Sequence, residues 1–132
     1  MILRYIFIAT VFIITACTDD SHVQNIQTLL EARNHSISQQ SIEKYTSLLD
    51  ANYLKHEGQH KVEQMAMVFT RFEKVQMGSR NQEIRILDDN HAICEQTYIL
   101  KVFADGDWRK IVQREQLTFS RTDGVWKISG GL

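Results

Sequence analysis

The sequence predicts an α+β domain in which three helices precede a four-stranded antiparallel sheet. Apolar residues recur at helical spacing up to about residue 78, and beyond that point apolar and polar residues alternate with a period of two. The stretches 91–104 and 107–121 indicate two long strands joined by Asp105-Gly106, a pair that supplies the positive φ angles of a tight hairpin turn. The chain contains no proline and no linker segment that would divide it, so one domain is expected.

Capping residues and apolar periodicity define the expected helices. A capping box of Ser21 and Gln24 starts the first helix, which ends near residues 34–36 and carries a stripe of Val23, Ile26, Leu29, Leu30 and Arg33. The second begins near Ser38 or Ser41 and ends at 50–52. Residues 53–56 are expected to be a short extended segment. Gly58 then precedes a third helix that ends at Gly78 and buries Val62, Met65, Phe69 and Phe72.

The strands should form a meander that curls around the helices. Ile84 and Ile86 alternate with charged residues, the long hairpin follows, and a turn at Asp123-Gly124 leads into a last strand at 125–129. Each hairpin arm would extend about 40 Å at roughly 3.3 Å per residue. Because a sheet of that length twists and bends, its concave side needs helices to fill it.

Composition excludes some classes of partner. An apolar content of 43% and a charged content of 23% are ordinary for a globular domain of 132 residues. The formal net charge is -1 and no basic run occurs, so nucleic acid is not an expected partner.

The first sixteen residues have the pattern of a secretory signal. Arg4 is their only charged side chain, an apolar run covers 5–16, and the run is shorter than the ~20 residues of a spanning helix. Ile14-Thr15-Ala16-Cys17 resembles the bacterial lipobox, which implies cleavage before Cys17 and acylation of that residue. Residues 17–22 would then be the lipidated cysteine and its tether. The alternative is an ordinary signal peptide or a short uncleaved anchor.

The lipobox resemblance also implies a location. In that family an aspartate directly after the cysteine retains the protein in the inner membrane, whereas Thr18 stands here, which favours the outer membrane with the domain facing the periplasm. The other cysteine, Cys94, lies in phase with apolar strand residues and is expected to be a buried, unreactive thiol.

The order of elements resembles the nuclear transport factor 2-like superfamily, which includes ketosteroid isomerases and SnoaL-like cyclases. The resemblance rests on residues 48–50 before the segment 53–56, on the long hairpin, and on the ending at 123–128. It implies a cone-shaped fold over residues 23–132, with three helices packed on a strongly curved sheet. Enzymes, binding proteins and interaction domains all use this fold, and no cofactor is expected.

Three polar residues interrupt the apolar face of the hairpin. That face comprises Ala92, Cys94, Tyr98, Leu100, Ile111, Leu117 and Phe119, and the residues that break its phase are Gln96, Gln113 and Glu115. A buried polar group without a partner costs about 1–3 kcal/mol. These three therefore either line a polar pocket or are turned outward by bulges. In a pocket, Glu115 would be a candidate general base.

His56 is the second candidate for proton transfer, because many SnoaL-like proteins carry a histidine at the pocket mouth; the alternative is an exposed histidine at a strand end. Tyr53, Tyr98 and Trp126 are expected to line the pocket or the core. Ketosteroid isomerases use an acid pair and a tyrosine, and that full set is not found here.

Residues 56–60 also match H-E-x-x-H, in which two histidines on one helix face bind zinc and the glutamate activates water. Gly58 would cost this helix about 1 kcal/mol. Loop residues are therefore expected, with His56 and His60 as weak metal candidates.

Three functions are thus compatible with the sequence. The first is a membrane-anchored, non-catalytic domain that binds a small apolar ligand or a protein partner, with a homodimer formed through Thr97, Ile99 and Val112 on the outer sheet face. The second is a SnoaL-like isomerase, cyclase or hydratase that uses His56 or Glu115. The third, a zinc hydrolase, would use His56, Glu57 and His60.

Overall fold

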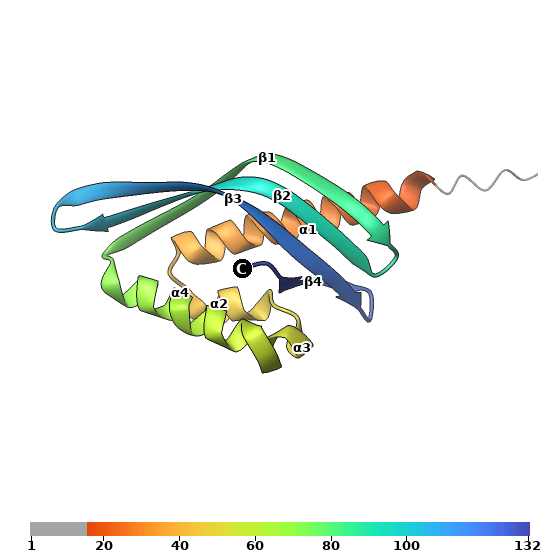
Figure 1. Ribbon diagram of the computed structural model, residues 1–132, viewed down its shortest axis with the longest axis horizontal. Coiled ribbons are helices and arrows are strands. Elements are labelled where there is room, and N and C mark those ends of the chain that lie inside the picture. The colour runs from red at the N-terminus through yellow and green to blue at the C-terminus, as the bar shows by residue number, and fades with distance from the viewer. Residues whose placement is uncertain (1–15) are drawn as a thin grey trace, which may run out of the picture.

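The chain folds into a long, bent antiparallel sheet with the helices gathered against one face (Figure 1). The computed structural model describes residues 16–132, so the signal sequence expected at 1–16 lies outside it apart from Ala16. The helices are α1 (Ala16–Ser38), α2 (Ile42–Ser47), α3 (Ala51–Tyr53), the π-helix η1 (Leu54–Gly58) and α4 (Gln59–Arg71). The strands are β1 (Lys74–Asp88), β2 (His91–Ala104), β3 (Asp107–Thr122) and β4 (Val125–Gly130). The predicted α+β class is confirmed.

The sheet is the predicted meander, with strand order β1-β2-β3-β4 and antiparallel pairing throughout. The hairpin turns where expected, because Asp105 and Gly106 adopt φ angles of 54° and 77°. Asp123 and Gly124 repeat this geometry between β3 and β4, at 52° and 76°. Local turn chemistry therefore fixes the register of both hairpins.

Directly opposed residues form three-residue rungs across β1, β2 and β3. The rungs Ile84–Cys94–Leu117 and Ile86–Ala92–Phe119 face the helices and supply the centre of the core. Cys94 is fully buried, and burial raises the pKa of its thiol to about 11. The expectation of a buried Cys94 is confirmed. A thiol in this environment is protonated at neutral pH and therefore a poor nucleophile.

Helix α1 is longer than predicted at both ends and packs along β1 (Figure 1). Its buried residues include Ile26, Leu30 and Ile37, which recur at helical spacing. The side chain of Asn34 donates to Ser79 Oγ at 3.0 Å and ties the helix to β1. Residues 17–22, expected to be a tether, belong to this helix. In the described part of the chain, no helix is long and apolar enough to cross a membrane.

The extended segment expected at 53–56 is helical, so that prediction is wrong. Asp50 adopts extended φ and ψ angles, and its Oδ2 accepts hydrogen bonds from the backbone N–H groups of Asn52 and Tyr53, both at 3.1 Å. An aspartate that caps two free N–H groups starts a helix. The extended residue is Leu49 instead, which forms a parallel bridge with Ile128 of β4.

The third predicted helix, α4, ends at Arg71 rather than at Gly78. Phe72 is already extended, and Gly78 lies inside β1 opposite Ile99. The carbonyl groups at the end of α4 are capped from a distance, since Gln40 Nε2 donates to the oxygens of Phe69 and Phe72 at 3.1 and 3.0 Å. This cap joins the α1–α2 turn to the end of α4.

Replacing Gln40 with alanine is expected to lower the free energy of unfolding by about 1 kcal/mol, because two neutral, partly buried hydrogen bonds are lost. Urea unfolding at neutral pH measures the change. Gln39→Ala is the matched control, since among the described residues the Gln39 side chain accepts only an exposed hydrogen bond from Lys44 Nζ. Equal stabilities for the two variants would contradict the capping role.

Candidate functional site

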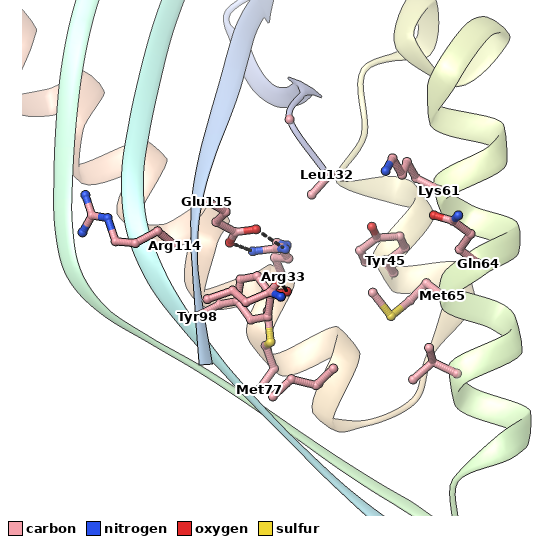
Figure 2. Close-up of a pocket in the computed structure, with 14 residues that line it drawn as sticks. Arg33, Tyr45, Lys61, Gln64, Met65, Met77, Tyr98, Arg114, Glu115 and Leu132 are labelled. Atoms are coloured by element: carbon pink, nitrogen blue, oxygen red, sulfur yellow. Dashed lines mark hydrogen bonds and ion pairs between the residues drawn. The ribbon is translucent and has the colours of Figure 1, made fainter. Parts of the chain in front are cut away.

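A cavity of about 390 Å³ lies between α4 and the concave face of the sheet (Figure 2). Its apolar wall includes Met65 and Val68 from α4, Met77 from β1, Leu100 from β2, and Leu132. Its polar wall includes Arg33 from α1, Tyr98, Gln113 and Glu115 from the hairpin, and Lys61 and Gln64 from α4. The cavity is therefore amphipathic, and every long element contributes to it.

The polar end of the cavity is organised by a buried ion pair. Arg33 Nη1 and Nη2 donate to the two carboxylate oxygens of Glu115 at 2.6 and 3.2 Å (Figure 2). The side chains are 4% and 9% exposed, so the pair is shielded from solvent. Two parallel hydrogen bonds fix the orientation of both groups. The Nε–H group of Arg33 is buried and has no partner among the described residues.

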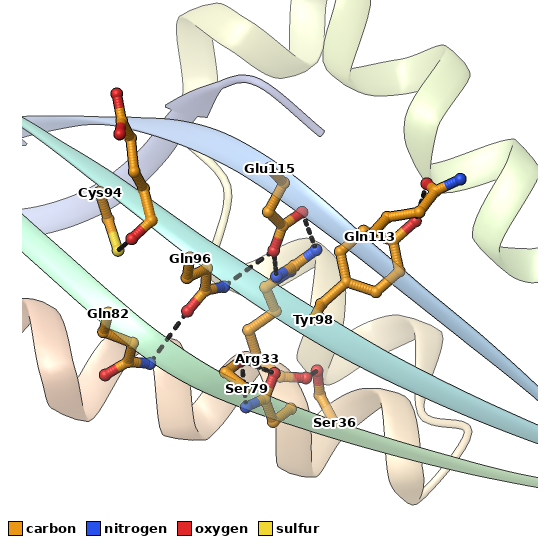
Figure 3. Close-up of polar contacts among 11 residues, drawn as sticks. Arg33, Ser36, Ser79, Gln82, Cys94, Gln96, Tyr98, Gln113 and Glu115 are labelled. Atoms are coloured by element: carbon orange, nitrogen blue, oxygen red, sulfur yellow. Dashed lines mark hydrogen bonds and ion pairs between the residues drawn. The ribbon is translucent and has the colours of Figure 1, made fainter.

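Two glutamine side chains extend the hydrogen bonding of this pair across the sheet, from β3 to the edge strand β1 (Figure 3). Gln96 Nε2 donates to Glu115 Oε1 at 2.8 Å, and Gln96 Oε1 accepts from Gln82 Nε2 at 2.9 Å. Gln82 reaches inward because the register of β1 shifts between Arg80 and Glu83. The bulge thus supplies the partner that the fully buried Gln96 needs.

Gln96 and Glu115 oppose each other on the inner face of the sheet, and the next inward-facing rung, Ser79–Tyr98–Gln113, is also polar. Tyr98 Oη donates to Gln113 Oε1 at 2.6 Å, with Ser79 opposite Tyr98 on β1. Burial raises the pKa of Tyr98, and the negative charge of Glu115 raises it further. Burial also raises the pKa of Tyr45 to about 12, with Arg33 acting in the opposite direction. Both tyrosines are therefore neutral at physiological pH and retain their hydroxyl protons.

Of the three polar residues that break the apolar phase, the structure turns Gln96 and Glu115 inward and places Gln113 at the cavity wall. Their strands do not bulge outward, because β2 and β3 pair without a shift in register. Sequence reasoning placed Arg33 on a buried helix face but did not assign it to the site. The signal that could have identified Arg33 was its position on the same helix face as the buried Ile26 and Leu30.

Comparison with known proteins assigns the chain to a family. The sequence profile of the calcium/calmodulin dependent protein kinase II association domain matches residues 22–129. The chain belongs to this family. Association domains have the nuclear transport factor 2-like fold, so the resemblance drawn from the sequence is confirmed. Among curated proteins, none matches the chain significantly.

Solved structures agree on the fold of this association domain. A protein from Streptomyces avermitilis named as a dehydratase of the NTF2-like family has a TM-score of 0.72 at 14% identity, over 85% of this chain and 94% of that chain. An association domain from Xanthomonas campestris has a TM-score of 0.68 at 17% identity, over 80% and 81%. A protein from Novosphingobium aromaticivorans named as a scytalone dehydratase has a TM-score of 0.72 at 13% identity, over 87% and 84%. These likenesses establish the fold alone.

Of the pocket candidates, His56 does not line the cavity of this association domain, whereas Tyr53 and Trp126 lie in the core, the other place expected for them. His56 is exposed, its Nδ1 lies 2.9 Å from the carbonyl oxygen of Asn52, and it does not line the cavity. Tyr53 belongs to the core. Trp126 is buried beside α1, where its Nε1 donates to His22 Nδ1 at 3.2 Å. The structure therefore does not bring His56 and Glu115 into one site.

The H-E-x-x-H sequence lies in helical structure rather than in the expected loop, but the helix is irregular. It crosses from η1 into α4, and His56 has φ and ψ angles of -121° and -107°, outside the helical region. His60 bonds Gln64 instead, at 3.2 Å between its Nε2 and the amide nitrogen. No group of three or more His, Cys, Asp or Glu within residues 16–132 is arranged to hold a metal ion. The regular helix that this zinc motif requires is absent here.

Proposed function

We propose that the protein is a lipoprotein of the bacterial cell envelope whose cavity binds a small amphipathic ligand without catalysis. The observation that carries this proposal is the amphipathic cavity of about 390 Å³, closed at its polar end by the Arg33–Glu115 pair. Its volume is near the lower end of the range of about 300–1,000 Å³ found for small-molecule pockets. The residues that line the cavity favour a ligand with an apolar body and one polar end.

The apolar body would pack against Met65, Met77 and Leu100, since unbranched methionine side chains adapt to irregular shapes. The polar end would meet the polar lining residues, among which Lys61 of α4 forms no ion pair with any described residue. The unpartnered Arg33 Nε–H is a further buried donor, and such a group costs about 1–3 kcal/mol when it is left unsatisfied. The site therefore retains capacity to donate hydrogen bonds to a ligand.

Binding is favoured over proton transfer by the state of Glu115. Its carboxylate already accepts two hydrogen bonds from Arg33 and one from Gln96. A general base needs an oxygen directed at the proton it removes, and these contacts direct both oxygens toward protein donors. His56 does not line the cavity and supplies no second acid or base.

The envelope location rests on the sequence. Ile14-Thr15-Ala16-Cys17 has the form of a lipobox, and several acyl chains on Cys17 would give stable anchoring at about 0.8 kcal/mol per buried CH₂. Thr18 after the cysteine favours the outer membrane. The domain would then face the periplasm.

Native mass spectrometry of the full-length protein extracted from membranes tests the ligand. We expect a bound small molecule that is lost in Met77→Trp, because the larger side chain fills the cavity. Met67→Trp is the matched control, since Met67 lies on α4 and is 69% exposed. An empty wild-type protein, or equal ligand retention in both variants, would reject the proposal. Labelling with palmitate, abolished by Cys17→Ser, tests the anchor separately.

A SnoaL-like enzyme is the second candidate, because solved structures with this fold are named as dehydratases and Tyr98 and Glu115 share the cavity. Incubating the purified protein with the released ligand separates the two functions. Recovery of the ligand at unchanged mass supports binding. Conversion to a product, abolished by Glu115→Gln, would support catalysis.

A further inference from the structure

Helix α4 is attached to the core more loosely than the other helices. None of its 13 residues is buried, whereas α1, α2 and α3 each contribute buried side chains. Its apolar residues Val62, Met65, Val68 and Phe69 recur at helical spacing but are only half-buried. The helix packs mainly against α2 and η1, and does not lie along the sheet as α1 does. The apolar face of α4 therefore retains surface that it would bury by moving closer to the sheet.

The cavity is the space that separates α4 from the sheet (Figure 2). The α4 residues that line it occupy positions i, i+3, i+4 and i+7, so they share one face of the helix: Lys61, Gln64, Met65 and Val68. The wall formed by β1 and β2 includes Met77 and Leu100. A movement of α4 toward these strands would narrow the cavity and bury apolar side chains on both walls.

Both ends of α4 have irregular backbone that suits a hinge. At the start, His56 in η1 has φ and ψ angles of -121° and -107°, and π-helical turns of this kind are frequent at functional sites. At the end, Phe72 changes abruptly to extended angles of -111° and 140°. Hinges are a few residues at the ends of elements that absorb such changes. Because Gln40 holds the end of α4 through the carbonyl oxygens of Phe69 and Phe72, the part nearer η1 has more freedom.

One charge on the cavity face of α4 opposes its closure. Lys61 is half-buried and forms no ion pair with any described residue. The carboxylate of Glu115 is already paired with Arg33, so it offers Lys61 no free counter-charge. Closing the helix would bury the ammonium group without a partner, which is strongly unfavourable. A ligand whose polar end accepts a hydrogen bond from Lys61 would remove this cost.

We propose that α4 is a hinged lid, which is open in the ligand-free protein and closes on a bound ligand. This inference rests on the proposed ligand-binding function and extends it. Apolar contacts favour the closed lid, whereas Lys61 favours the open lid until a ligand supplies an acceptor. An apolar molecule without an acceptor would thus enter the cavity but leave the lid open. Since α4 lies on the concave side of the sheet, its closure is compatible with a second copy of the chain on the outer face (Figure 1).

Removing the charge of Lys61 tests the lid without any ligand. In the full-length protein, Leu100→Cys places a reporter thiol on the cavity wall behind α4. Its reaction with iodoacetamide, a neutral reagent, would be located by peptide mass spectrometry, and the rate divided by the ionised fraction of the thiol. We expect Lys61→Met to slow this reaction by about tenfold, because exposure of the thiol follows the population of the open lid. The buried Cys94 should stay unmodified, which reports a folded core.

Two control variants separate closure of the lid from loss of charge. Lys61→Arg keeps the charge and should leave the rate unchanged, as should Lys55→Met, which removes an exposed charge from η1 outside the cavity. Met77→Cys supplies a second reporter thiol on β1 if Leu100→Cys does not fold. An unchanged rate in Lys61→Met, or equal slowing in Lys55→Met, would overturn the lid alone. A wild-type protein found empty by native mass spectrometry would instead reject the ligand, since the thiol measurement contains none.

Discussion

Replacing Arg33 with methionine is expected to lower the free energy of unfolding by about 3–5 kcal/mol, the range typical for a broken buried ion pair. The loss arises because Glu115 would remain buried with Gln96 as its only hydrogen-bond donor among its present partners. Most of the cost is thus the desolvation of an unpaired carboxylate rather than the strength of the pair itself. Urea unfolding at neutral pH, monitored by circular dichroism, measures the change.

The double variant Arg33→Met/Glu115→Gln tests that explanation. A glutamine at 115 keeps the shape of the side chain and an acceptor for Gln96 Nε2, but removes the buried charge. We therefore expect the double variant to be more stable than Arg33→Met alone. If the two substitutions simply added, the pair would not be coupled, and the lost packing of the arginine side chain would explain the effect.

Turn chemistry made the hairpins predictable from the sequence, because Asp105-Gly106 and Asp123-Gly124 encode their own φ angles. The alternating pattern then placed Cys94 and Phe119 on the inner face without knowledge of the rest of the fold. In contrast, the sequence predicts the end of a helix at Asp50, although the same residue caps the next helix. An aspartate between two helices is compatible with both roles, and only its side-chain contacts separate them.

The candidate site was predicted only in part, since its organising contact is not local. Arg33 and Glu115 are 82 positions apart, and neither residue alone indicates the other. The break in phase at Gln96 and Glu115 did indicate polar residues facing inward. Their hydrogen-bond partners could not be found from the sequence. Gln82 reaches Gln96 because of a bulge in β1, and Arg33 reaches Glu115 because of the way α1 packs on the sheet. Sequence patterns therefore identified the wall of the cavity but not its hydrogen-bond network.

Alkaline titration of Tyr45 is expected to destabilise the domain by about 2 kcal/mol as the pH rises from 10 to 12. Tyr45 is 1% exposed, and burial raises the pKa of its phenol to about 12 from an ordinary value of 10. The unfolded chain loses this proton near pH 10, whereas the folded chain holds it until about pH 12. Since the unfolded state then binds fewer protons, its stability relative to the folded state increases across this window. Below pH 10 both states are protonated, and Tyr45 gives no pH dependence.

Tyr45→Phe isolates this contribution, because it keeps the ring and removes the titrating group. Tyr53 and Tyr98 also have pKa values raised by burial, so the wild-type protein alone would report a sum over several phenols. We expect the variant to lose less stability than the wild type between pH 10 and 12, and the absorbance of phenolate near 295 nm to lose a late-titrating step. Parallel stability curves for the two proteins would show that Tyr45 is accessible to solvent, which would place water in the polar end of the cavity beside Arg33. The titration of one buried phenol thus reports directly on how dry the proposed ligand site is.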